Sequence, residues 1–217
     1  LDTDYIDFYQ LHNPRIDAIE KDEVFETLEE LKTAGKIRYY GSALGPDIGW
    51  FEEGEASMKE RDIHSVQIIY SILEQEPARD FFPIAKDREV GLISRVPHAS
   101  EALTGRYTEV PTFDESDHRS HRRAEWLGEA LRKVERVQFL AGEDVGRTLS
   151  QAAIQFVLYQ PAIVSVLPNF TNLEELNHYI ASVDTPTLTD EEQSQIDDLW
   201  ANGFELEEEA VTQFREI

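Results

Sequence analysis

Two polar side chains in this sequence occupy positions where parallel α/β folds carry out chemistry. The first is His12, near the end of the segment YIDFYQLHNP at residues 5–14. Large apolar or aromatic residues fill five of its first seven positions, which is typical of a strand buried on both faces. Pro14 cannot extend a sheet ladder, so His12 is predicted at the carboxyl end of the strand, where loops assemble active sites. Considered alone, a histidine there is more often structural than catalytic.

The second side chain is Gln67, at the centre of the apolar segment SVQIIYS. A polar side chain within a buried strand needs a hydrogen-bond partner. A bound ligand or the fold itself can supply that partner. Gln67 is therefore a candidate binding residue with a structural alternative.

Strand and helix patterns alternate along the chain. Strand patterns cover residues 5–12, 36–41, 63–73, 89–95 and 162–167, and helix patterns cover 17–34, 47–61, 77–88, 125–140, 150–159, 171–183 and 189–200. Gly35 follows the first helix as a C-cap, and Thr189 with Glu192 predicts a capping box. Regular alternation indicates right-handed βαβ units and a parallel sheet. Five units fit either an open doubly wound sheet or the last five units of a barrel.

We expect one domain over residues 1–217, with a long loop at 97–120 and an acidic tail at 202–217. Loops of that length in compact domains tend to be functional or mobile. The end of this loop and the residues after it hold a basic island, made of His118, Arg119, His121, Arg122 and Arg123. No acidic residues at metal-ligand spacing accompany it, so no metal site is predicted. The island is interpreted as a surface loop, either a lid over a ligand or an ion-paired patch.

The composition excludes several classes of partner. The formal net charge is -24, from 44 acidic and 20 basic residues, which repels nucleic acid and anionic membranes. The chain has no Cys and no apolar run of the ~20 residues that span a bilayer, so a cytoplasmic protein is expected. The sequence begins with Leu inside a strand pattern, so we expect further sequence upstream.

Six blocks in a fixed order carry a resemblance. They are DYIDFYQLHNP, LEELKTAGKIRYYG, SVQIIYSILEQEP, GLISRVPHASEALTGRY, TLSQAAIQFVLYQPAIVSVLPN and LTDEEQSQIDDL. Together they resemble the aldo-keto reductase family from its fourth barrel strand onward. The resemblance implies a partial (β/α)8 TIM barrel that holds strands 4 to 8 with their helices, the first three βα units being absent from this chain.

The family resemblance also implies a reaction. Members transfer a hydride between a nicotinamide cofactor and the carbonyl of an aldehyde, ketone or sugar, while a tyrosine donates the proton and an aspartate, a lysine and a histidine assist. His12 stands where that histidine belongs. The other three come from earlier strands, so we expect this chain alone to be inactive. The alternative is a non-catalytic nicotinamide-binding protein similar to the potassium-channel β-subunits.

Some cofactor positions can be transferred by resemblance. Gln67 matches the residue that binds the nicotinamide carboxamide, and Ser42 is expected to compensate for a missing Ser-Asn pair after strand five. Arg95 replaces a stacking aromatic residue, and could instead bind the pyrophosphate or an acidic substrate. Val96 and Pro97 begin the backbone cradle for the diphosphate, whereas the nearby His98 is expected to be an ordinary loop residue.

The segment after the last strand is expected to meet the adenosine end of the cofactor, through Pro168, Asn169, Thr171 and Glu175. A helix N-terminus favours anions. Glu175 stands near a position where the family often has a basic or amide residue, and a carboxylate suits a free ribose hydroxyl better than a phosphate. Because many members use NADP(H), the choice between NAD(H) and NADP(H) stays open. The predicted partner is a small-molecule carbonyl substrate, and open strand edges favour association into a homo-oligomer.

Overall fold

The computed structural model describes residues 2–45 and 50–206, and it consists of two compact units made from interleaved segments. The sheet unit comprises Leu1–Tyr70, Gln75–Arg95 and Gln160–Leu167. The second unit comprises Ser71–Glu74, Val96–Tyr159 and Pro168–Ile217. Within the described residues, no helix is both long enough and apolar enough to cross a membrane.

The sheet unit is built on five parallel strands in chain order. They are β1 (Ile6–His12), β2 (Ile37–Ala43), β3 (Ser65–Ile69), β4 (Gly91–Arg95) and β5 (Ile163–Leu167). All five predicted strands and their parallel pairing are confirmed. The prediction that the first strand is buried on both faces is wrong, because β1 is an outer strand and none of its residues is buried. β1 and β5 are the outer strands of this sheet.

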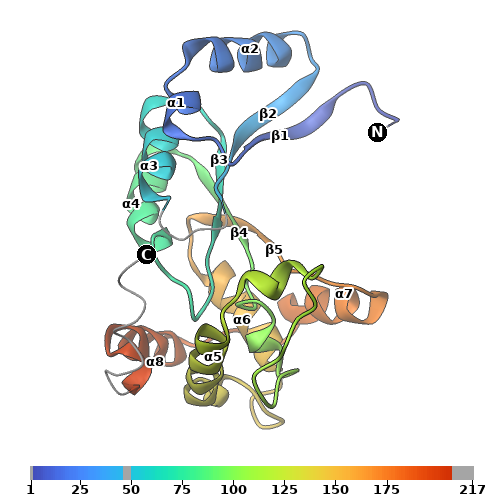
Figure 1. The fold of residues 1–217 in the computed structure, drawn as a ribbon, viewed down its shortest axis with the longest axis vertical. Coiled ribbons are helices and arrows are strands. Elements are labelled where there is room, and N and C mark those ends of the chain that lie inside the picture. Colours follow the sequence, from blue (N-terminus) through green and yellow to red (C-terminus); the bar gives the residue numbers. More distant parts are fainter. Residues whose placement is uncertain (1, 46–49, 207–217) are drawn as a thin grey trace. The chain divides into compact units, whose positions relative to one another are not determined.

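Within the described residues, the helices of the sheet unit are α1 (Ile16–Ile19), α2 (Asp22–Thr33), α3 (Phe51–Glu60) and α4 (Ala78–Arg88). Figure 1 shows α1, α3 and α4 stacked along one side of the strands. Tyr40 of β2, Val66 of β3 and Leu92 of β4 are buried. Tyr39, the residue before Tyr40, points to the other face of the sheet and is 54% exposed. One sheet face therefore carries most of the core of this unit.

The single helix predicted over residues 17–34 is wrong, because the structure breaks it between α1 and α2. Lys21 has an extended backbone at the break. Arg61 donates a hydrogen bond to the carbonyl oxygen of Ile19 at 2.6 Å and pairs with Asp22 at 2.7 Å. A distant guanidinium thus satisfies a carbonyl that a continuous helix would bond internally.

The second unit contains α5 (Ala124–Arg136), α6 (Leu149–Tyr159), α7 (Leu173–Ile180) and α8 (Asp190–Ala201). Nine consecutive residues of α6, from Leu149 to Val157, are buried. The predicted capping box at Thr189 and Glu192 opens α8. Short 3-10 turns lie at Ala102–Thr104, His118–His121, Gln138–Leu140, Ala181–Val183 and Gly203–Glu205. Of the predicted acidic tail, residues 207–217 lie outside the described residues.

Candidate functional site

The strand register places His12 and Gln67 on one face of the sheet. His12 pairs with Ala43, Ala43 with Gln67, Gln67 with Ile93, and Ile93 with Ser165. Because side chains alternate along a strand, the paired positions from β1 to β4 point to the same side of the sheet. His12 and Gln67 are two strands apart, or about 10 Å at the usual strand spacing, and only the small Ala43 stands between them.

The backbone of Asn13, directly after His12, marks the end of β1. Asn13 adopts a left-handed backbone with φ of 52°, and its amide donates a hydrogen bond to the Ala43 carbonyl oxygen at 2.8 Å. This confirms that His12 closes the strand. His12 is exposed and Gln67 is partly buried. Within the described residues, no hydrogen-bond partner of the Gln67 amide is found, so the structural alternative for this residue finds no support.

Ser42 lies on the opposite face of the sheet from His12 and Gln67. It pairs with Leu11 and Val66, one position before the row that holds the two candidate residues. Its side chain is fully buried, and its hydroxyl accepts a hydrogen bond from Ser57 of α3 at 3.2 Å. The predicted contact of this hydroxyl with a carboxamide would require it to leave Ser57 and cross the sheet.

Arg95 lies at the carboxyl end of β4, on the side of the sheet that carries Gln67. It pairs with Ile69, two positions beyond Gln67. Its guanidinium donates to the carbonyl oxygens of Leu44 at 3.2 Å and Gly45 at 2.6 Å. Arg95 therefore ties the end of β4 to the segment that follows β2.

Val96 and Pro97 follow β4 directly and begin the long segment of the second unit. Val96 has φ of 58°, and Ala99, Ser100 and Glu101 follow with φ of 48°, 53° and 74°. Such left-handed residues other than glycine cost free energy and cluster at functional sites. The amide of Ala99 donates to the Val96 carbonyl oxygen at 3.0 Å, which closes a tight turn around Pro97.

His98, in this turn, is a packing residue. It is 2% exposed, its Nε2 lies 3.1 Å from the Ser150 carbonyl oxygen, and its ring centroid is 4.6 Å from that of Tyr179. Burial lowers the pKa of His98 to about 4, so the imidazole is neutral at pH 7. The interpretation of His98 as an ordinary residue without a catalytic role thus fits its surroundings.

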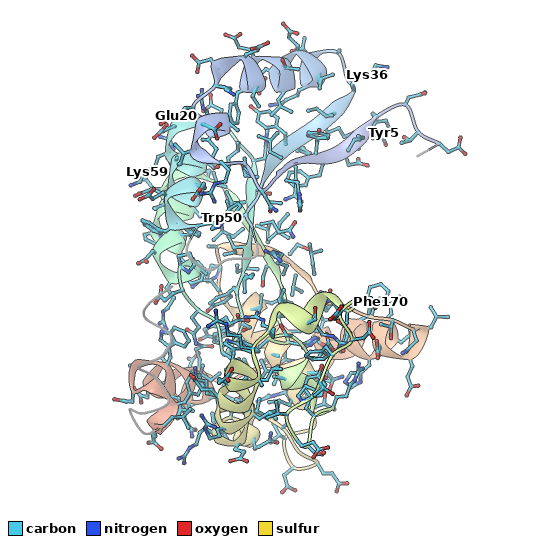
Figure 2. The ribbon with its side chains drawn as sticks, viewed as in Figure 1. Tyr5, Glu20, Lys36, Trp50, Lys59 and Phe170 are labelled. Carbon is cyan, nitrogen blue, oxygen red and sulfur yellow. The ribbon has the colours of Figure 1, made fainter. Side chains whose placement is uncertain are left out.

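The segment after β5 leads into α7 through Pro168, Asn169 and Phe170. Phe170, labelled in Figure 2, is half exposed just before this helix. Asn172 is the N-cap, and its side chain accepts a hydrogen bond from the Glu175 amide at 2.9 Å. The amide and hydroxyl of Thr171 both donate to Glu175 Oε2, at 2.7 and 3.1 Å. Thr171 and Glu175, both predicted as binding residues, therefore form one bonded group.

Arg106 joins this group, although the sequence analysis did not select it. Its Nη2 donates to Glu175 Oε1, and its Nη1 lies 3.9 Å from Glu101 Oε2. The Thr171 amide, followed by Arg106, lowers the pKa of Glu175. A sequence signal existed, because Arg106 is the only Lys or Arg between residues 96 and 118.

Two of the three arginines of the basic island, Arg119 and Arg122, are ion-paired, as one interpretation of the sequence had it. Arg119 binds Asp117 at 2.6 Å and the Tyr107 hydroxyl at 3.0 Å, and Arg122 pairs with Glu74 at 2.7 Å. The side chains of His118 and His121 lie outside the described residues. Among the residues that are described, no group of three His, Cys, Asp or Glu side chains could hold a metal ion.

Comparison with known proteins gives a consistent picture. A family model described as "Aldo/keto reductase family" matches residues 1–201. The uncharacterized oxidoreductase YqkF of Bacillus subtilis is 31% identical over 195 residues, which cover 88% of this chain and 59% of that protein. A relative from Escherichia coli named NADH-specific methylglyoxal reductase is 26% identical over 187 residues, or 84% of this chain and 56% of that protein.

A solved structure extends the likeness to three dimensions. The holo form of the aldo-keto reductase AKR11C1 from Bacillus halodurans superposes with a TM-score of 0.67 at 28% identity. The match covers 91% of this chain and 62% of that one. The chain therefore has a barrel-like α/β fold, and it spans about three fifths of the length of these relatives.

Proposed function

The chain belongs to the aldo-keto reductase family, and on that premise we propose that it forms part of an oxidoreductase that transfers a hydride between a nicotinamide cofactor and the carbonyl of an aldehyde, ketone or sugar. The observation that carries this proposal is the register row that holds His12 and Gln67 on one sheet face. When bound, the nicotinamide supplies or accepts the hydride.

His12 is proposed to orient and polarise the carbonyl. Negative charge develops on the carbonyl oxygen during hydride addition, and a preorganised donor at that oxygen lowers the barrier. The exposed position of His12 at the end of β1 leaves its imidazole accessible to a small molecule.

Gln67 is proposed to bind the carboxamide of the nicotinamide. Its own amide is partly buried and has no partner among the described residues, which fits a group that bonds to a ligand. An amide side chain can donate to one atom of a carboxamide and accept from the other. Arg95 is proposed to fix the backbone beside the nicotinamide, since its guanidinium donates hydrogen bonds to the segment after β2.

The second unit is proposed to bind the diphosphate and adenosine end of a dinucleotide. The backbone at Val96 and Pro97 and the start of α7 at Pro168, Asn169 and Thr171 carry this role. A carboxylate at Glu175 suits a ribose hydroxyl, and the E. coli relative is named NADH-specific, whereas the family includes NADP(H) users. Both NAD(H) and NADP(H) remain within this part of the proposal.

The family's Asp, Tyr and Lys are proposed to have no counterparts among these 217 residues, since the resemblance begins at the fourth barrel strand. We therefore propose that the five strands correspond to strands 4 to 8 of a (β/α)8 barrel and that this chain alone shows no turnover. The alternative, a non-catalytic nicotinamide-binding protein, uses the same residues for the cofactor. A tyrosine or a phenylalanine at the proton-donor position distinguishes the two. A cytoplasmic location and association through the open strand edges complete the proposal.

Cofactor binding tests this function directly. We expect NADH to bind the 217-residue chain, as measured by its fluorescence, and Gln67→Ala to weaken binding about tenfold, the usual effect of losing one good hydrogen bond. Gln195→Ala, a matched change at an exposed position of α8, should leave the affinity unchanged. Absence of NADH and NADPH binding, or an equal effect of the two substitutions, would contradict the proposed role.

A further inference from the structure

A cavity of about 510 Å³ lies in the sheet unit, where α4 ends and where β4 and β5 begin. Most of its wall is apolar. The apolar side chains come from α4, from the residue before β4 and from the start of β5, and include Phe82, Pro83, Val90, Pro161 and Val164. Cavities of this size with apolar walls and a few polar groups are typical of sites for small molecules.

The cavity lies at the opposite end of the strands from the row of His12 and Gln67. It is lined by Gly91, the first residue of β4, whereas Arg95 ends that strand. The length of β4 separates the two ends by about 13 Å at the usual rise of a strand. The cavity is therefore distinct from the candidate site at the carboxyl ends of the strands.

Glu89 lines the cavity and conflicts with its local structure in two ways. It ends α4 with φ of 55°, a left-handed backbone that favours glycine. It also places a negative charge at the negative end of the helix dipole. Among the described residues, its carboxylate makes no hydrogen bond or ion pair that would offset these costs. Local conflict without a compensating contact is expected at functional sites.

Lys86 lines the same cavity, three residues before Glu89. Residues at this spacing on a helix are neighbours that can form an ion pair, yet Lys86 makes none within the part of the chain that is described. Both side chains are exposed. A cation near the end of a helix is favourable by itself, so Lys86 alone has a structural explanation whereas Glu89 has none. Two opposite charges thus stand at the cavity without neutralising each other.

Gln160 adds an amide group from the segment before β5. Its Oε1 accepts a hydrogen bond from the Ala162 amide at 3.3 Å. Its Nε2 has no partner among the residues that the structure describes, and this nitrogen can donate two hydrogen bonds. The cavity therefore combines a cation, an anion and a neutral donor with an apolar wall.

We propose that this cavity binds a small zwitterion with an apolar body, of the class of the apolar α-amino acids. Lys86 and the Gln160 nitrogen bind the carboxylate of the ligand, Glu89 binds its ammonium, and Phe82 and Pro83 contact its apolar body. The two charged groups of an α-amino acid are attached to one carbon atom, which suits two unpaired charges three residues apart. The ligand does not meet the nicotinamide site, so the inference does not depend on the proposed function.

Isothermal titration calorimetry of the full chain with L-phenylalanine tests this inference. We expect a dissociation constant below about 1 mM. Glycine lacks the apolar body and should bind at least about tenfold more weakly. The analogue 3-phenylpropanoate lacks the ammonium, and phenethylamine lacks the carboxylate. Each should bind about fivefold more weakly than L-phenylalanine, the usual effect of losing one exposed charge pair.

The variant Glu89→Gln keeps the shape of the side chain and removes its charge. L-phenylalanine should bind it about fivefold more weakly, whereas the affinity for 3-phenylpropanoate should stay the same, because that analogue has no ammonium. Lys86→Gln should give the complementary result, with phenethylamine as the unaffected analogue.

Glu30→Gln in α2 and Lys21→Gln before α2 are the matched controls. Both residues are exposed, and their side chains have no ion pair or hydrogen bond among the described residues. Each control should leave the affinity for L-phenylalanine within about 1.5-fold. Circular dichroism checks the fold of every variant, and the analogue series on the unchanged chain tests the inference even where a variant fails to fold.

A dissociation constant for L-phenylalanine above about 1 mM overturns the inference. Equal binding of L-phenylalanine and 3-phenylpropanoate to the unchanged chain also overturns it, as do equal effects of Glu89→Gln and Glu30→Gln. NADH binding to Glu89→Gln should match that of the unchanged chain. Failure of the amino acid to bind therefore leaves the proposed cofactor binding intact.

Discussion

The sheet unit and the second unit place their candidate functional side chains by different means. In the sheet unit, His12 and Gln67 share a face because the ladder from β1 to β3 fixes their register. In the second unit, Arg106, Glu101 and Glu175 are held by side-chain pairs between distant segments and by left-handed backbone. The sheet thus positions groups through repeated backbone bonds, whereas the second unit relies on a few individual contacts.

The largest expected effect comes from disturbing the ladder. A Cβ atom at Gly41 would stand 2.1 Å from the Ser65 carbonyl oxygen, so Gly41→Val must push β2 and β3 apart. We expect a loss of about 4–5 kcal/mol in the free energy of unfolding, measured by urea denaturation.

The control for this change is Gly128→Ala in α5. A Cβ atom there meets only ordinary contacts, the nearest at 3.7 Å from Val110. Alanine is the better helix former, so this change should stabilise the chain by about 0.5–1 kcal/mol. Equal effects of the two glycine substitutions would contradict the tight ladder.

The second effect concerns the buried ion pair of Arg122 and Glu74. The Glu74 side chain is 2% exposed and the Arg122 side chain 12%, so Arg122→Met leaves a carboxylate buried without its cation. The expected loss of stability is about 3–4 kcal/mol. Arg106→Met is the comparison, because the Arg106 side chain is 44% exposed and its pair should contribute less than about 1 kcal/mol. A loss at Arg106 as large as that at Arg122 would refute this ranking.

A smaller effect depends on pH and on His98. Burial lowers the pKa of His98 from 6.5 to about 4, so protons bind the unfolded chain more readily than the folded one. The stabilisation is complete above pH 6.5 and is lost progressively as the pH falls toward 4. The loss amounts to about 2.5 kcal/mol at pH 4.5.

Other groups titrate in the same range, so the difference between the chain and a His98→Gln variant is the quantity to measure. Glutamine can still hydrogen bond to the Ser150 carbonyl oxygen but carries no titratable proton. The stability of the chain relative to the His98→Gln variant should fall by about 2.5 kcal/mol between pH 7 and 4.5. Curves that stay parallel would show that His98 is not buried in its neutral form.

The contrast between the units also explains which features the sequence predicted. The apolar runs around residues 5–12 and 65–69 were sufficient to predict β1 and β3. His12 was selected because it ends the first run, and Gln67 because it is polar within the second. Ser42 shows the limit of this reasoning. Its face depends on the register between β2 and β3, and a shift of one residue exchanges the faces.

Contacts between residues far apart in sequence account for the features that the sequence did not predict. The helix break near residue 20 depends on Arg61, about 40 positions away in sequence. Likewise, the pair of Arg106 and Glu175 spans 69 positions. No local periodicity records such partners. Arg106 could be recognised in the sequence as a lone basic residue, but its pairing with two carboxylates could not.

Glu101 links two properties that are usually altered separately. Glycine would accept its left-handed backbone without a Cβ penalty and would remove a buried carboxylate. Every glutamate codon becomes a glycine codon through a single base change, so this substitution is readily available to mutation. The same step would raise stability and loosen the hold on Arg106. Drift toward a more stable protein is therefore expected to leave Arg106 with one carboxylate partner in place of two.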